Sequence, residues 1–175
     1  MNQMSILERR RIEALVLKNV YEVIRERSGE EEAQAAIGEA VSRSAIEQGK
    51  SFADELGRTP TIQDFADIQP LWTKENALEI DVISQGEDHF DFNVTRCRYS
   101  EMYREMGLGH IGHLLSCNRD GDFCIGYNPE MKLERTQTIM KGASHCDFRY
   151  RLDKTEDNTK GGGMKEVALT GRTDR

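Results

Sequence analysis

The sequence predicts an α+β fold, with N-terminal helices packed on a four-stranded antiparallel sheet made of two hairpins with a helical crossover. Three features lead to this prediction. Apolar residues recur at a helical period up to about residue 68, the period changes to two from Ala77 onward, and a glycine-containing helical stretch separates two pairs of alternating segments. Helices and strands in separate runs are typical of α+β domains.

The 175 residues are enough for one domain with a full core and too few for two independent domains. We expect a single domain over 1–152, with 1–72 as a helical scaffold and 77–152 as the sheet and pocket. The segment 153–175 is polar and contains three consecutive glycines, so it predicts a flexible C-terminal tail.

Charge and hydropathy limit the classes of partner. The net charge of −7 disfavours nucleic acid and anionic membranes. The first residues are charged where a signal peptide has its apolar run, and no stretch approaches membrane-spanning length. We therefore expect a cytoplasmic protein that binds a small molecule and not a membrane or a nucleic acid. The sequence leaves open whether copies of the chain form a homo-oligomer.

The first helix is predicted over 6–27, because Ser5 and Glu8 have the spacing of a capping box. We expect its apolar stripe to face the core: Ile12, Leu15, Val16, Val20, Val23 and Ile24. A second helix begins at the acidic residues 30–32 and ends at Gly57.

A third helix is predicted behind Thr59 and Pro60, and Pro70 marks its end. Its apolar face contains Ile62 and Phe65. We assign all three N-terminal helices to packing and expect no catalytic residue among them.

Alternation predicts two hairpins, with strands near 78–82 and 90–97 and again over 131–140 and 146–152. The inward-facing residues of the four strands include Leu78, Ile80, Val82; Phe90, Phe92, Val94, Arg96; Met131, Leu133, Arg135, Gln137, Ile139; and Cys146, Phe148, Tyr150, Leu152. Two arginines thus share apolar faces. A buried guanidinium needs a carboxylate, either from an internal acid or from a ligand. We therefore predict a polar-lined pocket over the sheet.

The crossover between the hairpins carries further candidate residues. We expect a short helix over 100–106, and a second helical region from about His110 to Cys117, resuming after Gly121. A helical conformation would place His110, His113, Cys117 and Asp120 on one face, where they could act as zinc ligands. Spacing on one helix is a weak metal signal and the chain has no Cys-x-x-Cys, so we expect no metal and no cofactor. Cys117 and Asp120 alone form a thiol and carboxylate pair.

Several short motifs occur in order along the chain: Phe92-Asn93-Val94-Thr95-Arg96-Cys97-x-Tyr99, Gly107, Leu115-x-Cys117-x-x-Asp120, and Arg135-Thr136-Gln137-Thr138-Ile139-x-x-Gly142-x-x-x-Cys146-Asp147-Phe148-Arg149. As a set they resemble the L-2-amino-thiazoline-4-carboxylic acid hydrolase family. The second hairpin is also similar to the vinyl reductase type of small-molecule-binding domain, although Gln137 and Thr138 stand where such domains tend to place another cysteine.

The resemblance implies a hydrolase that opens a small cyclic amidine or isothiourea acid, such as 2-aminothiazoline-4-carboxylate, at a C–S or C–N bond to give an N-carbamoyl amino acid. The amidine carbon accepts a nucleophile, which we predict to be the Cys117 thiol, with Asp120 orienting the amidine. A water aimed by Asp120 is the second route, and Cys146 is the next candidate thiol.

We expect the substrate carboxylate to be held by Arg135 or Arg96. Gln137, Thr136 and His113 complete the predicted substrate-binding set, and His113 or His145 is a candidate base. The alternative to an enzyme is a non-catalytic sensor or carrier domain with the same pocket, or a subunit that needs a partner enzyme.

Overall fold

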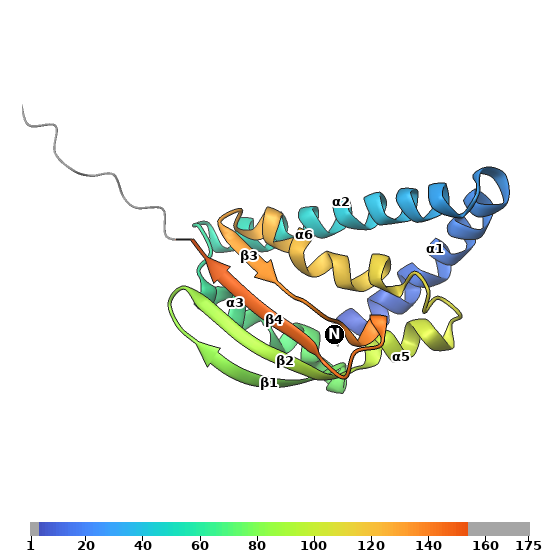
Figure 1. Ribbon diagram of the computed structural model, residues 1–175. Coiled ribbons are helices and arrows are strands. Elements are labelled where there is room, and N and C mark those ends of the chain that lie inside the picture. The colour runs from blue at the N-terminus through green and yellow to red at the C-terminus, as the bar shows by residue number, and fades with distance from the viewer. Residues whose placement is uncertain (1–3, 154–175) are drawn as a thin grey trace, which may run out of the picture.

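In the computed structural model, which describes residues 4–153, a layer of helices packs on one face of a twisted sheet (Figure 1). The helices are α1 (Ile6–Ser28), α2 (Glu30–Leu56), α3 (Ile62–Ile68), α4 (Pro70–Thr73), α5 (Arg98–Glu105) and α6 (Asn118–Tyr127). A π-helical turn, η2 (His113–Cys117), leads directly into α6. The predicted tail beyond residue 153 lies outside the described residues.

The sheet has four strands in the order β1-β2-β4-β3, and each neighbouring pair is antiparallel: β1 (Leu78–Gln85), β2 (His89–Cys97), β3 (Met131–Glu134) and β4 (Cys146–Leu152). Helices α5 and α6 connect the two hairpins, so the predicted α+β architecture is confirmed (Figure 1). Aromatic residues of the two central strands form the inner face, with Phe92 stacked on Phe148 at 4.9 Å between ring centroids.

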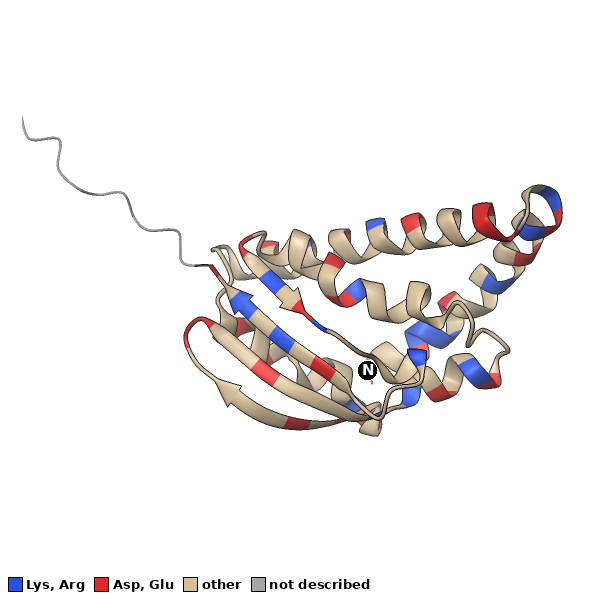
Figure 2. Ribbon diagram, viewed as in Figure 1, with Lys and Arg blue, Asp and Glu red and all other residues tan. Residues whose placement is uncertain are grey.

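Charged residues are distributed along the strands (Figure 2). On β2 and β4, Asp91 pairs with Arg151, and Arg149 donates a hydrogen bond to Asn93 at 3.0 Å. These residues alternate with the buried aromatic residues, as expected for a sheet with one face covered by helices and the other open to solvent.

Strand β3 is shorter than predicted, because the chain leaves the sheet after Glu134. The backbone N–H groups of Thr136 and Gln137 donate to the Asp147 carboxylate at 3.0 and 2.9 Å instead of continuing the ladder. The expected face shared by Arg135 and Gln137 therefore does not exist, since alternation holds only inside a strand.

The capping prediction is confirmed for α1, where the Ser5 hydroxyl accepts a hydrogen bond from the Glu8 N–H. It is displaced by two residues for α3. The N-cap there is Thr61, which forms a reciprocal capping box with Asp64, while the exposed Arg58 binds the same carboxylate through both of its terminal nitrogens.

The predicted inward stripe of α1 is wrong. Five of its members are exposed by 42–62%: Ile12, Leu15, Val16, Val20 and Val23. The helix instead buries the face that carries Arg10, Ala14 and Tyr21. Ala14 is small enough for close packing, and Arg10 is tolerated inside because acceptors surround its guanidinium. A pattern counted in apolar residues alone misses a buried face that contains an arginine.

Helix α6 is held by a close backbone crossing with α2 (Figure 1). A Cβ atom placed on Gly126 would lie 2.0 Å from the Ile46 carbonyl oxygen, and one placed on Gly49 would lie 2.2 Å from the Phe123 carbonyl oxygen. Only glycine permits this approach at either position. Among the described helices, none combines the length and the apolar character that a membrane span needs.

We expect Gly126→Ala to lower the free energy of unfolding by at least about 2 kcal/mol, because the added methyl group must push two helix backbones apart. Gly121→Ala on the same helix is the matched control. No atom lies within 4 Å of its Cβ position, so alanine should be neutral or stabilising by about 0.5–1 kcal/mol. Urea denaturation of both variants measures the difference, and equal stability of the two would contradict the crossing.

Candidate functional site

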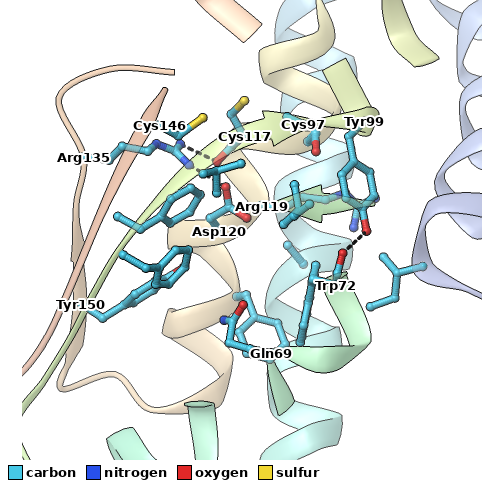
Figure 3. Close-up of a pocket in the computed structure, with 18 of the residues that line it drawn as sticks. Gln69, Trp72, Cys97, Tyr99, Cys117, Arg119, Asp120, Arg135, Cys146 and Tyr150 are labelled. Carbon is cyan, nitrogen blue, oxygen red and sulfur yellow. Dashed lines mark hydrogen bonds and ion pairs between the residues drawn. The ribbon is translucent and has the colours of Figure 1, made fainter. Parts of the chain in front are cut away.

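A cavity of about 80 Å³ lies between the helices and the inner face of the sheet (Figure 3). That is room for several groups the size of a water molecule, and hence for a small organic ligand. Seven aromatic side chains line it: Phe65, Trp72, Phe92, Tyr99, Phe123, Phe148 and Tyr150. Its ionisable and thiol groups are Arg10, Arg119, Asp120, Arg135, Cys97, Cys117 and Cys146. An apolar cavity with a few polar groups is typical of a ligand site.

Of the residues predicted from sequence, Cys117, Asp120, Arg135 and Cys146 meet in this cavity. Arg135 follows the end of β3 and reaches α6, where its Nη1 donates to Asp120 Oδ2 at 2.6 Å and its Nη2 donates to the Cys117 carbonyl at 2.7 Å. Its guanidinium carbon also lies 4.9 Å from the centroid of the Phe148 ring. The anion that this buried arginine requires is thus supplied by the protein itself.

Arg96 lies outside the cavity, so its predicted place on the apolar face is wrong. The pairing of β1 with β2 skips Thr95, because Glu79 stands opposite Arg96 and Ile80 stands opposite Val94. This irregularity reverses the alternation of the last residues of β2. Arg96 therefore turns outward, half exposed, onto Glu101 and Glu79, and Cys97 turns into the cavity.

Asp120 has the most unusual environment of the candidate residues. Burial raises the pKa of its carboxyl group, and Arg135 opposes that shift through its charge and its hydrogen bond. The side chain keeps 28% of its surface exposed, and it is the Oδ2 atom that binds Arg135. Within the described residues, no hydrogen bond to the Oδ1 atom occurs, so one carboxylate oxygen is available to a ligand in the cavity.

The three cavity thiols differ in what holds them. Cys97 Sγ accepts the Ser100 N–H at 3.4 Å as the N-cap of α5, and Cys146 Sγ accepts the Ile139 N–H at 3.2 Å. Among the described residues, no hydrogen bond to the Cys117 sulfur is found. Burial, followed by the charge of Asp120, raises the pKa of Cys117 to about 12, so its thiol is neutral near pH 7.

The predicted one-face arrangement of His110, His113, Cys117 and Asp120 is not formed. His110 precedes the helical segment and contacts Tyr21 edge-on, and the π-helical turn changes the angular spacing from His113 onward. His113 does not line the cavity, and burial lowers its pKa. Within residues 4–153, no group of three or more histidine, cysteine or acidic side chains is arranged to hold a metal ion.

The other predicted binding residues, Gln137 and Thr136, lie in the turn that follows Arg135. Thr136 is exposed and donates its hydroxyl to Asp147 at 2.6 Å, and the Gln137 side chain contacts the His145 ring. Neither residue lines the cavity. Both hold the turn that aims Arg135 toward α6, through their bonds to Asp147.

The helices supply cavity residues that the sequence analysis did not single out. Arg10 of α1 is 6% exposed at its side chain and binds both oxygens of Glu13, at 2.8 and 2.7 Å. Arg119 of α6 is 9% exposed and donates to the same carboxylate at 3.1 Å. Trp72 and Gln69 also line the cavity. The sequence signal for such a buried cation is an arginine within an otherwise apolar helix face, and Arg10 has that position.

The fold and the cavity together define an α+β protein with an internal pocket that combines aromatic walls, thiols and buried ion pairs. Residues 9–150 match the family described as L-2-amino-thiazoline-4-carboxylic acid hydrolase, and the chain therefore belongs to that family. The resemblance found in the sequence motifs is thereby confirmed. Among curated proteins, no sequence matches this chain.

Two solved structures share the fold. The phenol-responsive sensory domain of the transcription activator PoxR, with phenol, is 11% identical, has a TM-score of 0.51 and is aligned over 79% of this chain and 73% of that one. A trafficking protein particle complex subunit 3 from Naegleria fowleri, covalently bound to palmitic acid, is 11% identical, with a TM-score of 0.50, over 83% of this chain and 96% of that one. At this identity the likeness shows the fold alone.

We expect the Asp120–Arg135 pair to be strongly coupled. Arg135→Gln alone should cost about 3–5 kcal/mol of stability, because it leaves a buried carboxylate without its partner. The double variant with Asp120→Asn should lose less than the sum of the two single losses, by about 1–3 kcal/mol. Urea denaturation of the four proteins at pH 7 completes the cycle. Additive losses would mean that the pair does not interact in solution.

Proposed function

We propose that this protein is a hydrolase that opens a small cyclic amidine acid of the 2-aminothiazoline-4-carboxylate type. The observation that carries the proposal is a partly buried carboxylate, Asp120, with one oxygen available beside a thiol in a small aromatic cavity. Membership of the hydrolase family supports the same substrate class. An amidinium ion is planar and binds a carboxylate as a guanidinium does, so Asp120 suits the reacting end of such a ring.

The reaction adds one water molecule to the amidine carbon. The oxygen of water bonds to the carbon between the ring sulfur and nitrogen, and the carbon–sulfur bond then breaks. The sulfur leaves with the bonding electron pair and takes a proton, which gives a free thiol and an N-carbamoyl group. No oxidant or reductant is required.

We assign the role of general base to Asp120. A carboxylate whose pKa is raised by burial is a stronger base than an exposed one. The available oxygen of Asp120 has two lone pairs, so it can hold an amidine N–H and also accept the proton of the attacking water. The neutral thiol of Cys117 favours water over sulfur as the nucleophile, because a thiol with a pKa of about 12 is almost entirely protonated at neutral pH. Cys117 then shapes the cavity wall beside the reacting carbon.

Incubation with 2-aminothiazoline-4-carboxylate tests the activity directly. We expect N-carbamoylcysteine in the mass spectrum, one new thiol per molecule consumed in a thiol assay, and a loss of at least a hundredfold in kcat for Asp120→Asn. A protein that shifts its melting temperature with this compound and never consumes it would be a sensor or carrier instead. The PoxR sensory domain, crystallised with phenol, has a similar fold and is an example of such a sensor.

The choice between water and thiol is tested at Cys117. We expect Cys117→Ala to keep kcat within about tenfold of wild type, since the alanine removes only a wall group in the water mechanism. A loss as large as that of Asp120→Asn would restore the thiol as nucleophile. Rapid quenching and intact mass spectrometry should then show an adduct on Cys117, with Cys146→Ala as the matched thiol control.

The pH dependence should follow the Asp120 carboxyl group. The base acts only when deprotonated, so kcat/KM should rise with pH through the pKa of Asp120 in the free protein, and that pKa is raised above its ordinary value near about 4. In Arg135→Gln the acid limb should move to higher pH, because the positive charge that stabilises the carboxylate is lost. An acid limb that stays in place in this variant would remove Asp120 from the role of base.

A further inference from the structure

We propose that the ligand's anionic group binds at Arg119, with Arg10 behind it, on the helical wall of the cavity, and not at Arg135 or Arg96. The assignment rests on the proposed function only for the identity of the ligand as a small carboxylic acid. It gives the pocket two neighbouring subsites, one for the amidine at Asp120 and one for the carboxylate at Arg119. The sequence had pointed to Arg135 and Arg96 for the second role.

The hydrogen bonds of Arg119 leave it incompletely satisfied. Its Nε donates to the Leu115 carbonyl at 3.0 Å and its Nη2 donates to Glu13 at 3.1 Å. Its Nη1 atom is buried and has no hydrogen-bond partner among the described residues. The Arg119 side chain is more than nine-tenths buried and lines the cavity, and an unused charged donor in such a side chain favours an acceptor that reaches it.

The charges around the cavity lead to the same conclusion. Arg10, Arg119 and Arg135 are buried or nearly so, and the carboxylates bound to them are Glu13 and Asp120. Asp120 pairs with Arg135, so Arg10 and Arg119 share the single charge of Glu13. One positive charge in this cluster has no carboxylate of its own. A buried cation without a counter-ion is costly, and a bound anion removes that cost.

The alternatives within the chain are already occupied. Arg135 binds Asp120 and the Cys117 carbonyl, and Arg96 is half exposed and binds two glutamates away from the cavity. The burial of Arg119, together with the nearby charge of Arg10, lowers its pKa to about 10, which still leaves it protonated at neutral pH. Arg119 is therefore the cavity cation to which we assign the ligand carboxylate.

The order of the two subsites suits the proposed ring. Arg119 and Asp120 are consecutive residues at the start of α6, and both line the cavity (Figure 3). In 2-aminothiazoline-4-carboxylate the carboxylate is borne by the carbon next to the amidine nitrogen, so the anion and the cation of the ligand are also neighbours. Binding at both ends fixes the amidine carbon beside Asp120 and limits the orientations from which water attacks.

Equilibrium binding followed by Trp72 fluorescence tests the assignment without requiring turnover. Trp72 is the single tryptophan of the chain and lines the cavity. The two probes are 2-aminothiazoline-4-carboxylate, in titrations completed before any consumption, and 2-aminothiazoline, which lacks the carboxylate. We expect wild type to prefer the acid by about 10- to 100-fold, the range of one charged hydrogen-bond interaction. Arg119→Gln should reduce that preference to near unity.

Three further variants separate this subsite from a general loss of folding. Arg119→Lys keeps the charge and should retain part of the preference. Arg96→Gln should leave it unchanged. Arg135→Gln should weaken both ligands alike, since it acts through Asp120. A comparison of two ligands on one variant is independent of the amount of folded protein.

Two results would overturn the proposal. One is that the wild-type protein binds the two compounds with equal affinity, or binds neither of them. The other is a preference that survives in Arg119→Gln and Arg119→Lys, or that disappears in Arg135→Gln instead. If the preference depends on Arg119 while no compound is consumed, the subsite stands and the proposed hydrolysis fails.

Discussion

The partly buried ion pair between Asp120 and Arg135 is the contact on which the site depends. It joins the first turn of α6 to the segment that leaves β3, and so ties the helical layer to the sheet across the cavity. A pair of this kind adds little net stability, because both charges lose their hydration on burial. Removing one partner is nevertheless costly, because the charge of the other partner is then left without a counter-charge. The pair therefore fixes where α6 stands over the sheet more than it strengthens the fold.

The same helix also carries Arg119. Its place is fixed on the other side by the backbone crossing with α2, where Gly49 and Gly126 allow contact that no side chain would permit. Asp120 and Arg119 thus face the cavity from one rigid support, with aromatic rings from both layers around them. A site supported on packed elements holds its groups more accurately than one built on loops.

Sequence patterns were sufficient for the architecture, because periodicity reports which face of an element is buried. The change of period near Ala77 gave the sheet, and the alternation of Phe148 with Arg149 gave the inner face of β4. The patterns failed where a local irregularity changes the number of residues per repeat, because every later side chain then points to a different face. The skipped residue Thr95 turned Arg96 outward and Cys97 inward, and the π-helical turn separated His113 from Cys117 and Asp120.

The candidate site was found in part for similar reasons. Cys117, Asp120, Arg135 and Cys146 all lie within the short motifs identified in the sequence, and all four line the cavity. Arg10 and Arg119 lie on helices, where a charged side chain is usually solvated, and their shared bond to Glu13 shows that they are buried together. The partner of Arg135 also depended on tertiary contacts, since an internal acid and a ligand were both compatible with its sequence position.

A crystal structure with a stable nitrogen analogue of the substrate, 2-aminoimidazoline-4-carboxylate, tests the account most directly. Its ring lacks the carbon–sulfur bond that breaks, so the complex should persist. We predict that the cyclic guanidinium lies against the available oxygen of Asp120 and that the carboxylate lies within hydrogen-bond distance of Arg119. A ligand whose carboxylate displaces Asp120 from Arg135, or one bound outside the cavity, would contradict the account.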